Sequence, residues 1–203
     1  MNTSIALPSS SLNGIIPLYV ARSRAWQAEA MLIVAGAALM ALAAQARIIT
    51  PFSTVPFTFQ TMIALGLGVA LGARTAFLTM AAYLVAGVLG APVFTGWAAG
   101  PAVFAGHTSG YLLGMLMAAT LVGALSTEAN VKSPVRLAGV LALGQVVTFV
   151  TGASMLMVLG LSFQQAIVGG VLAFLPWEMV KLTLLAGILP LMCKAAETLR
   201  RDA

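Results

Sequence analysis

Long apolar runs make up most of the chain, and short polar or proline-containing stretches separate them. A run of ~20 apolar residues crosses a bilayer core of ~30 Å as one α-helix. The runs break at Arg47, Arg74, Pro92 and the polar stretch 126–133. This pattern predicts six transmembrane helices, over residues 26–46, 57–72, 75–91, 109–125, 134–160 and 176–192. A further apolar piece, 166–175, is too short to span and is predicted to be re-entrant or interfacial.

The composition of the 203 residues excludes several classes of protein. Hydrophobic residues make up 61% and charged residues only 7%, whereas a soluble domain carries about a quarter charged residues. The net charge of +5 comes from ten cations and five anions. They are scattered and form no basic face that could track a nucleic acid. We therefore predict an all-α integral membrane protein with a cytoplasmic segment at 1–25, a six-helix domain at 26–195 and a cytoplasmic tail at 196–203.

The distribution of cations predicts the orientation. If the amino terminus is cytoplasmic, only Arg47 and Lys181 fall on the outer side. The other eight cations fall on the inner side: Arg22, Arg24, Arg74, Lys132, Arg136, Lys194, Arg200 and Arg201. This positive-inside bias predicts that both termini are cytoplasmic. Residues 1–25 are not expected to be a signal peptide, because no cation precedes Arg22.

Two loops on the predicted outer side hold unusual residues. Residues 47–60 contain two prolines and five hydroxyl or amide side chains, and 92–110 is rich in glycine. Irregular backbone at membrane depth must be buried in protein or line a cavity, although an ordinary polar connector also fits the first loop. His107 begins the fourth predicted helix, where free N–H groups favour an anion. It fits either a pocket residue or an interfacial cap.

Glu178 and Lys181 give the sharpest signal in the sequence. They stand three apart in the last predicted helix, so they share one face. Each costs ~2.5–3.5 kcal/mol within a membrane span. A purely structural pair is the alternative, but apolar residues can replace such a pair with little loss. We therefore predict a binding role and no catalysis, since no second acid, histidine cluster or serine triad accompanies Glu178.

Small residues recur at helix-contact spacing. The pairs Gly68–Gly72 and Gly110–Gly114 are predicted to let helices of the bundle approach each other closely. The pair Ala37–Ala41 fits either internal packing or contact with another membrane protein.

Four motifs carry a resemblance to a known family. They are residues 51–60 (PFSTVPFTFQ), 83–94 (YLVAGVLGAPVF), 106–114 (GHTSGYLLG) and 174–181 (FLPWEMVK). In family order on a six-span chain, they resemble BioY, the biotin-specific S components of energy-coupling factor (ECF) transporters, over roughly residues 26–193. Two places depart from the family pattern. His107 and Ser109 replace a proline and a glycine, and Glu178 replaces an aspartate.

The resemblance implies a six-helix ECF S-component bundle in the bacterial inner (cell) membrane. Such a subunit captures biotin from outside and releases it inward with a transmembrane coupling subunit and ATP-binding subunits. Ala37 and Ala41 would contact the coupling subunit. No cofactor is implied, because biotin is the transported ligand. The predicted binding residues are Ser53, Thr58, Gln60, Thr95, Gly96, Trp97, His107, Tyr111, Glu178 and Lys181.

Biotin chemistry suits these groups. Its cyclic urea has two N–H donors and one carbonyl acceptor, and its chain ends in a carboxylate. Glu178 can accept from the urea N–H groups, Lys181 can donate to the carbonyl, and His107 can meet the carboxylate; the reverse pose is also open. The alternatives are an S component for another small vitamin, a stand-alone secondary transporter with Glu178 as proton carrier, and a membrane enzyme using His107 and Glu178.

Overall fold

Each of the six predicted spans contains a helix in the computed structural model, which describes residues 25–51 and 53–201, although residues 57–59 of the second span precede its helix. The long helices are α2 (Ala25–Gln45), α3 (Gln60–Val88), α4 (Ser109–Leu125), α6 (Pro134–Val158) and α8 (Leu175–Arg201). The helix α3 contains two of the predicted spans. Four helices are long and apolar enough to cross a membrane, and α4 is a shorter apolar helix. Most of the predicted cytoplasmic segment 1–25 lies outside the described residues.

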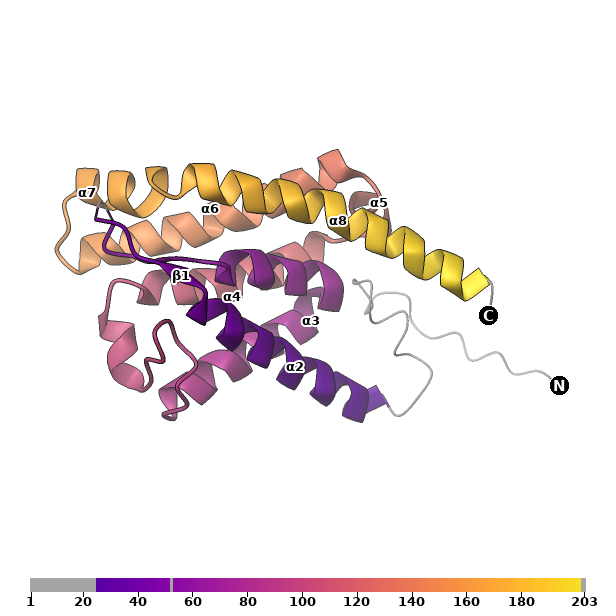
Figure 1. The fold of residues 1–203 in the computed structure, drawn as a ribbon, viewed down its shortest axis with the longest axis horizontal. Helices are drawn as coiled ribbons and strands as arrows, with labels where there is room; N and C mark the ends of the chain where they lie inside the picture. Colours follow the sequence, from indigo (N-terminus) through magenta and orange to yellow (C-terminus); the bar gives the residue numbers. More distant parts are fainter. Residues whose placement is uncertain (1–24, 52, 202–203) are drawn as a thin grey trace.

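A bend at Gly72 divides α3 into the two predicted spans. Gly72 has φ 75° and ψ 168°, a combination that only glycine adopts without strain. In Figure 1 the second part of α3 returns toward the end of the bundle that carries the loop before α4. The first part, of twelve residues, is only ~18 Å long. It is therefore shorter than the ~30 Å core of a bilayer.

The apolar piece predicted as re-entrant or interfacial is helical and comes directly before α8. Residues Phe163–Ile167 form α7, and Val168–Leu172 form one π-helical turn, η2. Ser162 begins α7 with a capping box to Gln165. The last predicted span begins at Pro176, and proline is favoured in the first turn of a helix. Helix α8 does begin there, at Leu175, but α7 and η2 precede it, and α8 continues to Arg201.

Close helix contacts build the core between α3, α4 and α6. A side chain at Gly68 would lie 2.5 Å from the Ala119 carbonyl oxygen of α4, and one at Gly110 would collide with Met155 of α6. Both predicted small-residue pairs thus lie at internal helix contacts. Ala37 and Ala41 of α2 are half-buried and pack against the same core, so contact with a partner stays a prediction.

The two ends of the bundle differ. Figure 1 shows that α2 begins and α8 ends toward the same end of the bundle as α5 (Glu128–Val131), whereas β1 (Arg47–Ile48) and α7 lie toward the opposite end. Arg74, at the bend of α3, forms an ion pair of 3.3 Å with Glu29 of α2. Several apolar side chains between the two ends face outward, among them Leu42, Val150 and Leu191. A bilayer rather than water suits such a surface, and the chain is a membrane protein.

Candidate ligand-binding site

The first loop forms one wall of a cavity at the β1 end of the bundle. Its two short strands, β1 and β2 (Phe57–Thr58), pair antiparallel, with Arg47 opposite Thr58. The Ser53 hydroxyl donates to the Gly169 carbonyl at 2.8 Å, which fixes this loop to η2. Phe57 stacks on Phe174 with ring centroids 4.2 Å apart. The loop is therefore held to η2 by a hydrogen bond and to Phe174, just before α8, by an aromatic contact.

The second loop, between α3 and α4, is held from the end of α2. Gln45 donates from Nε2 to the Phe94 carbonyl at 3.1 Å, and its Oε1 accepts from the Trp97 backbone N–H at 3.1 Å. Gly96 has φ 74°, and the Arg47 guanidinium occupies the space where a side chain would lie. The two loops therefore meet at Arg47.

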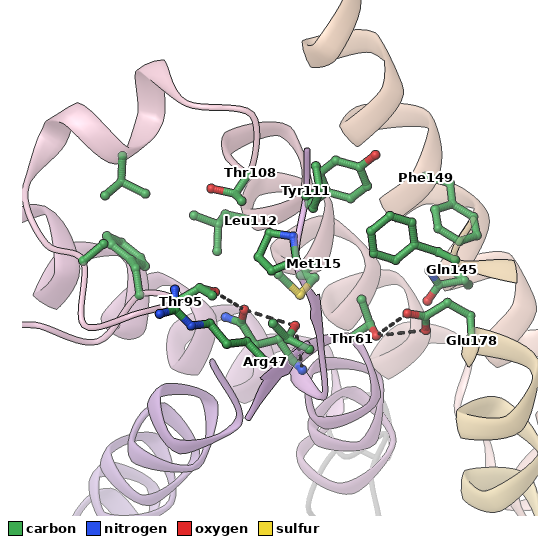
Figure 2. Close-up of a pocket in the computed structure, with 18 residues that line it drawn as sticks. Arg47, Thr61, Thr95, Thr108, Tyr111, Leu112, Met115, Gln145, Phe149 and Glu178 are labelled. Atoms are coloured by element: carbon green, nitrogen blue, oxygen red, sulfur yellow. Dashed lines mark hydrogen bonds between the residues drawn. The ribbon is translucent and has the colours of Figure 1, made fainter. Parts of the chain in front are cut away.

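Both loops and four helices enclose a cavity of about 260 Å³. Figure 2 shows Arg47 and Thr95 on one side of it and Gln145, Phe149 and Glu178 on the other. Arg47 is exposed, whereas Glu178 is 3% exposed. The cavity thus runs from a cation near the surface to a buried acid. Its lining residues are Arg47, Val55, Pro56, Thr58, Gln60, Thr61, Phe94, Thr95, Ala98, Val103, Thr108, Tyr111, Leu112, Met115, Gln145, Phe149, Phe174 and Glu178.

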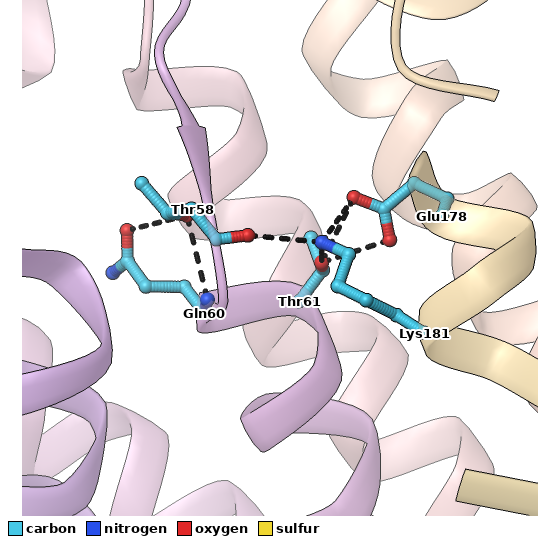
Figure 3. A network of polar contacts seen from close by, with 5 residues as sticks. All are labelled: Thr58, Gln60, Thr61, Glu178 and Lys181. Carbon is cyan, nitrogen blue, oxygen red and sulfur yellow. Dashed lines mark hydrogen bonds and ion pairs between the residues drawn. The ribbon is translucent and has the colours of Figure 1, made fainter. Parts of the chain in front are cut away.

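Lys181 holds Glu178 in place from behind the cavity. Its ammonium lies 2.5 Å from Glu178 Oε1 and donates to Thr61 Oγ1 at 2.6 Å and to the Thr58 carbonyl at 2.9 Å. The Thr61 hydroxyl lies 3.0 and 2.9 Å from the two carboxylate oxygens. Figure 3 shows this network joining α8 to the start of α3. The three partners of Lys181 match the three donors of an ammonium group, so the cation is fully used within the protein.

The other polar residues of the wall near β2 are also paired. Gln60 is 3% exposed and donates from Nε2 to the Tyr83 hydroxyl at 2.8 Å. Its Oε1 accepts from the Thr95 and Thr58 hydroxyls at 3.2 and 3.4 Å. Tyr111 donates to the Gly170 carbonyl at 2.7 Å. These contacts fix the shape of the cavity and leave few free donors in its wall.

Gln145 of α6 differs from these paired polar residues, because its side-chain amide has no partner among the described residues. It is 4% exposed and lines the cavity. Neither its amide nitrogen nor its amide oxygen has a hydrogen-bond partner among the described residues. A buried polar group without a partner is rare and costs about 1–3 kcal/mol.

The structure brings together half of the predicted binding residues. Five of the ten line the cavity: Thr58, Gln60, Thr95, Tyr111 and Glu178. Ser53, Gly96 and Lys181 lie directly behind residues of the lining. Trp97 and His107 are exposed and outside the lining.

Several lining residues are not among those predicted from the sequence. The sequence predicts Arg47 only as a loop cation, and it does not predict Thr61, Thr108, Phe149 or Phe174 as site residues. Gln145 did have a usable signal, because it is an amide within a mostly apolar predicted span, where polar side chains usually face the interior.

The arrangement favours binding of a molecule with three parts. The buried end offers a carboxylate acceptor and a free amide, the middle is apolar, and the mouth carries a cation. Such a cavity fits a ligand with a polar head, an apolar body and an anionic end. Among the described residues, no group of three His, Cys, Asp or Glu side chains is placed to hold a metal ion.

Comparison with known proteins places this cavity in context. The model of the BioY family matches residues 18–198. The chain is 30% identical over 169 residues to the biotin transporter BioY of Thermotoga maritima, covering 83% of this chain and 98% of that protein. It is 34% identical over 139 residues to the biotin transporter BioY of Rhizobium etli, covering 64% and 73%.

One solved structure has a similar fold. It is the crystal structure of the S component for biotin from an ECF-type ABC transporter, with a TM-score of 0.72. The match covers 83% of this chain and 92% of that chain, at 23% sequence identity. The likeness bears out the predicted S-component-like bundle of helices.

Proposed function

The chain belongs to the BioY family of transporters, and from this premise we propose that it is the biotin-binding S component of an ECF transporter. Membership in a transporter family sets aside the membrane-enzyme alternative. The cavity carries the proposal. One buried carboxylate, one apolar middle and one cation near the surface match the urea, the ring and chain, and the carboxylate of biotin.

In the proposed pose, the urea lies at the buried end. The Glu178 carboxylate accepts hydrogen bonds from the urea N–H groups, and Lys181 orients and neutralises that carboxylate. The biotin carboxylate lies near Arg47, which is the one cation lining the cavity among the described residues. The sequence assigned this role to His107, but the exposed His107 lies outside the lining.

The six-helix domain at residues 26–195 is proposed to capture biotin from the outer side of a bacterial inner membrane, with both termini of the chain on the cytoplasmic side. Two observations support this orientation. The cavity lies at the end opposite Arg74 and α5, and the predicted inner cations Arg74, Lys132 and Arg136 belong to segments around that far end. Release inward is assigned to a coupling subunit, with Ala37 and Ala41 as its contact, and to ATP-binding subunits.

Titration calorimetry of the purified protein tests the function. Biotin should bind, whereas thiamine and riboflavin should give no heat. Glu178→Gln should weaken biotin about tenfold or more, because a charge-assisted hydrogen bond to the urea is lost. Glu29→Gln is the matched control. It removes another paired glutamate, at the far end of the bundle, and should leave biotin affinity unchanged.

Two results would contradict this reading. Absence of biotin binding by the wild type would reject the function itself. Equal affinity of the wild type and Glu178→Gln would remove Glu178 from the site while leaving the function in place. Uptake into cells that lack coupling and ATP-binding subunits, abolished by an uncoupler, would instead favour a stand-alone secondary transporter.

A further inference from the structure

Gln145 stands out from every other buried polar group of the described chain. Four buried side-chain atoms have no hydrogen-bond partner among the described residues, and two of them are the amide nitrogen and oxygen of Gln145. The other two, Thr50 Oγ1 and Trp177 Nε1, belong to residues that do not line the cavity. Gln145 is thus the described residue that is both unpartnered and placed to meet a ligand.

Gln145 lines the same cavity as the buried acid. Figure 2 shows Gln145 between Phe149, one turn along α6, and Glu178 of α8. Both neighbours also line the cavity. A ligand that fills the cavity can therefore contact both Glu178 and Gln145.

Most other donors near Glu178 are already used. The ammonium of Lys181 has three protein acceptors, and the Thr61 hydroxyl is directed to the Glu178 carboxylate. The Tyr111 hydroxyl donates to the Gly170 carbonyl. A carboxylate can only accept hydrogen bonds. A ligand with N–H groups on Glu178 and an adjacent carbonyl therefore needs a donor, and the Gln145 amide can supply it.

We propose that Gln145 is a specificity-determining ligand contact, whose amide N–H groups donate to the carbonyl oxygen of a cyclic urea held by Glu178. This inference rests on the proposed function. It revises the sequence-based hypothesis that Lys181 donates to this carbonyl. Because the Gln145 amide is buried and has no hydrogen-bond partner among the described residues, a ligand carbonyl would provide the acceptor that it lacks.

Substitution of both partners of this contact tests the proposal. The protein change is Gln145→Met, which keeps the length of the side chain and removes both polar atoms. The ligand change is from biotin to 2-thiobiotin, whose thiocarbonyl sulfur is a weaker acceptor than oxygen. Calorimetry on the purified wild type and on Gln145→Met with each ligand yields four dissociation constants, and the control variant adds two more. Leu112→Val, which alters an apolar part of the lining on α4, is the matched control.

The proposal predicts a change in the ratio of the two dissociation constants. Gln145→Met should weaken biotin about tenfold to 100-fold, because the buried urea carbonyl then lacks a donor. It should weaken binding of 2-thiobiotin much less. The preference for biotin over 2-thiobiotin should therefore be smaller in Gln145→Met than in the wild type. Leu112→Val should affect both ligands by a similar factor and leave the ratio unchanged.

Stability separates a ligand contact from a structural role. Removal of an unpartnered buried amide should leave the unfolding temperature of the ligand-free protein unchanged or raise it. Unchanged biotin affinity and an unchanged ratio in Gln145→Met would overturn the proposal, as would lowered stability with equal losses for both ligands. In either case the wild type would still bind biotin, so the proposed function would stand.

Discussion

Removal of the Lys181 ammonium should destabilise the protein more than removal of the whole ion pair. Lys181 is 1% exposed, and its ammonium lies 2.5 Å from Glu178 Oε1. Lys181→Met keeps most of the aliphatic stem but leaves the Glu178 carboxylate buried without its cation. Breaking one partner of a buried pair costs about 3–5 kcal/mol. We expect a loss of this size in the free energy of unfolding.

The double substitution Glu178→Gln, Lys181→Met should recover part of that loss. It removes both charges, and a neutral amide replaces the carboxylate beside Thr61. The Thr58 carbonyl still lacks the donor that Lys181 supplied at 2.9 Å. One unmet buried carbonyl costs about 1–3 kcal/mol. The double variant should therefore be more stable than Lys181→Met and less stable than the wild type.

Thermal unfolding in detergent, followed by tryptophan fluorescence without biotin, measures all three proteins. We expect the wild type to have the highest unfolding temperature, the double variant an intermediate one and Lys181→Met the lowest. A double variant at or below the unfolding temperature of Lys181→Met would refute the reasoning, because the loss would then not come from an uncompensated charge. A Lys181→Met protein as stable as the wild type would refute it equally.

Three further substitutions, with His107→Ala as a control, probe the bend of α3, the mouth of the cavity and the first loop. Gly72→Ala should lower stability by about 1–3 kcal/mol in the same unfolding assay, because φ 75° strains a side chain; wild-type stability would contradict this. Arg47→Gln should weaken binding of biotin about tenfold but leave binding of biotin amide, which lacks the carboxylate anion, unchanged. His107→Ala should change the affinity for neither ligand. Equal effects of Arg47→Gln on both ligands would exclude Arg47 as the carboxylate contact. Ser53→Ala removes the hydrogen bond to Gly169 and should speed biotin release in stopped-flow experiments; an unchanged release rate would show that this bond does not restrain the loop.

The sequence predicted the helices because their signals are local. An apolar run of spanning length, ended by a cation or proline, indicates where a helix lies without knowledge of its neighbours. The pairing of Glu178 with Lys181 was also predictable, since a spacing of three residues places both side chains on one helix face. The structure confirms that pair at 2.5 Å.

The remaining features depend on contacts that are distant in sequence. Nothing near Lys181 indicates that the Thr58 carbonyl and Thr61 hydroxyl, more than one hundred residues earlier, use its other donors. Likewise, the motif containing His107 does not show which of its side chains faces the cavity; the structure places Thr108 in the lining instead. Composition identified the loops that form the site, but only packing selects the residues within them.

The π-helical turn η2 explains how the site can be enclosed by segments so far apart. π-helical turns are rare in proteins, and those that occur often lie at functional sites. Two successive carbonyls of η2 accept from outside it: Gly169 from the Ser53 hydroxyl at 2.8 Å and Gly170 from the Tyr111 hydroxyl at 2.7 Å. The same turn thus holds the first loop and α4 against the start of α8, which carries Glu178 a few residues later. Movement of η2 would therefore change the loop, the Tyr111 wall and the approach to the buried acid together.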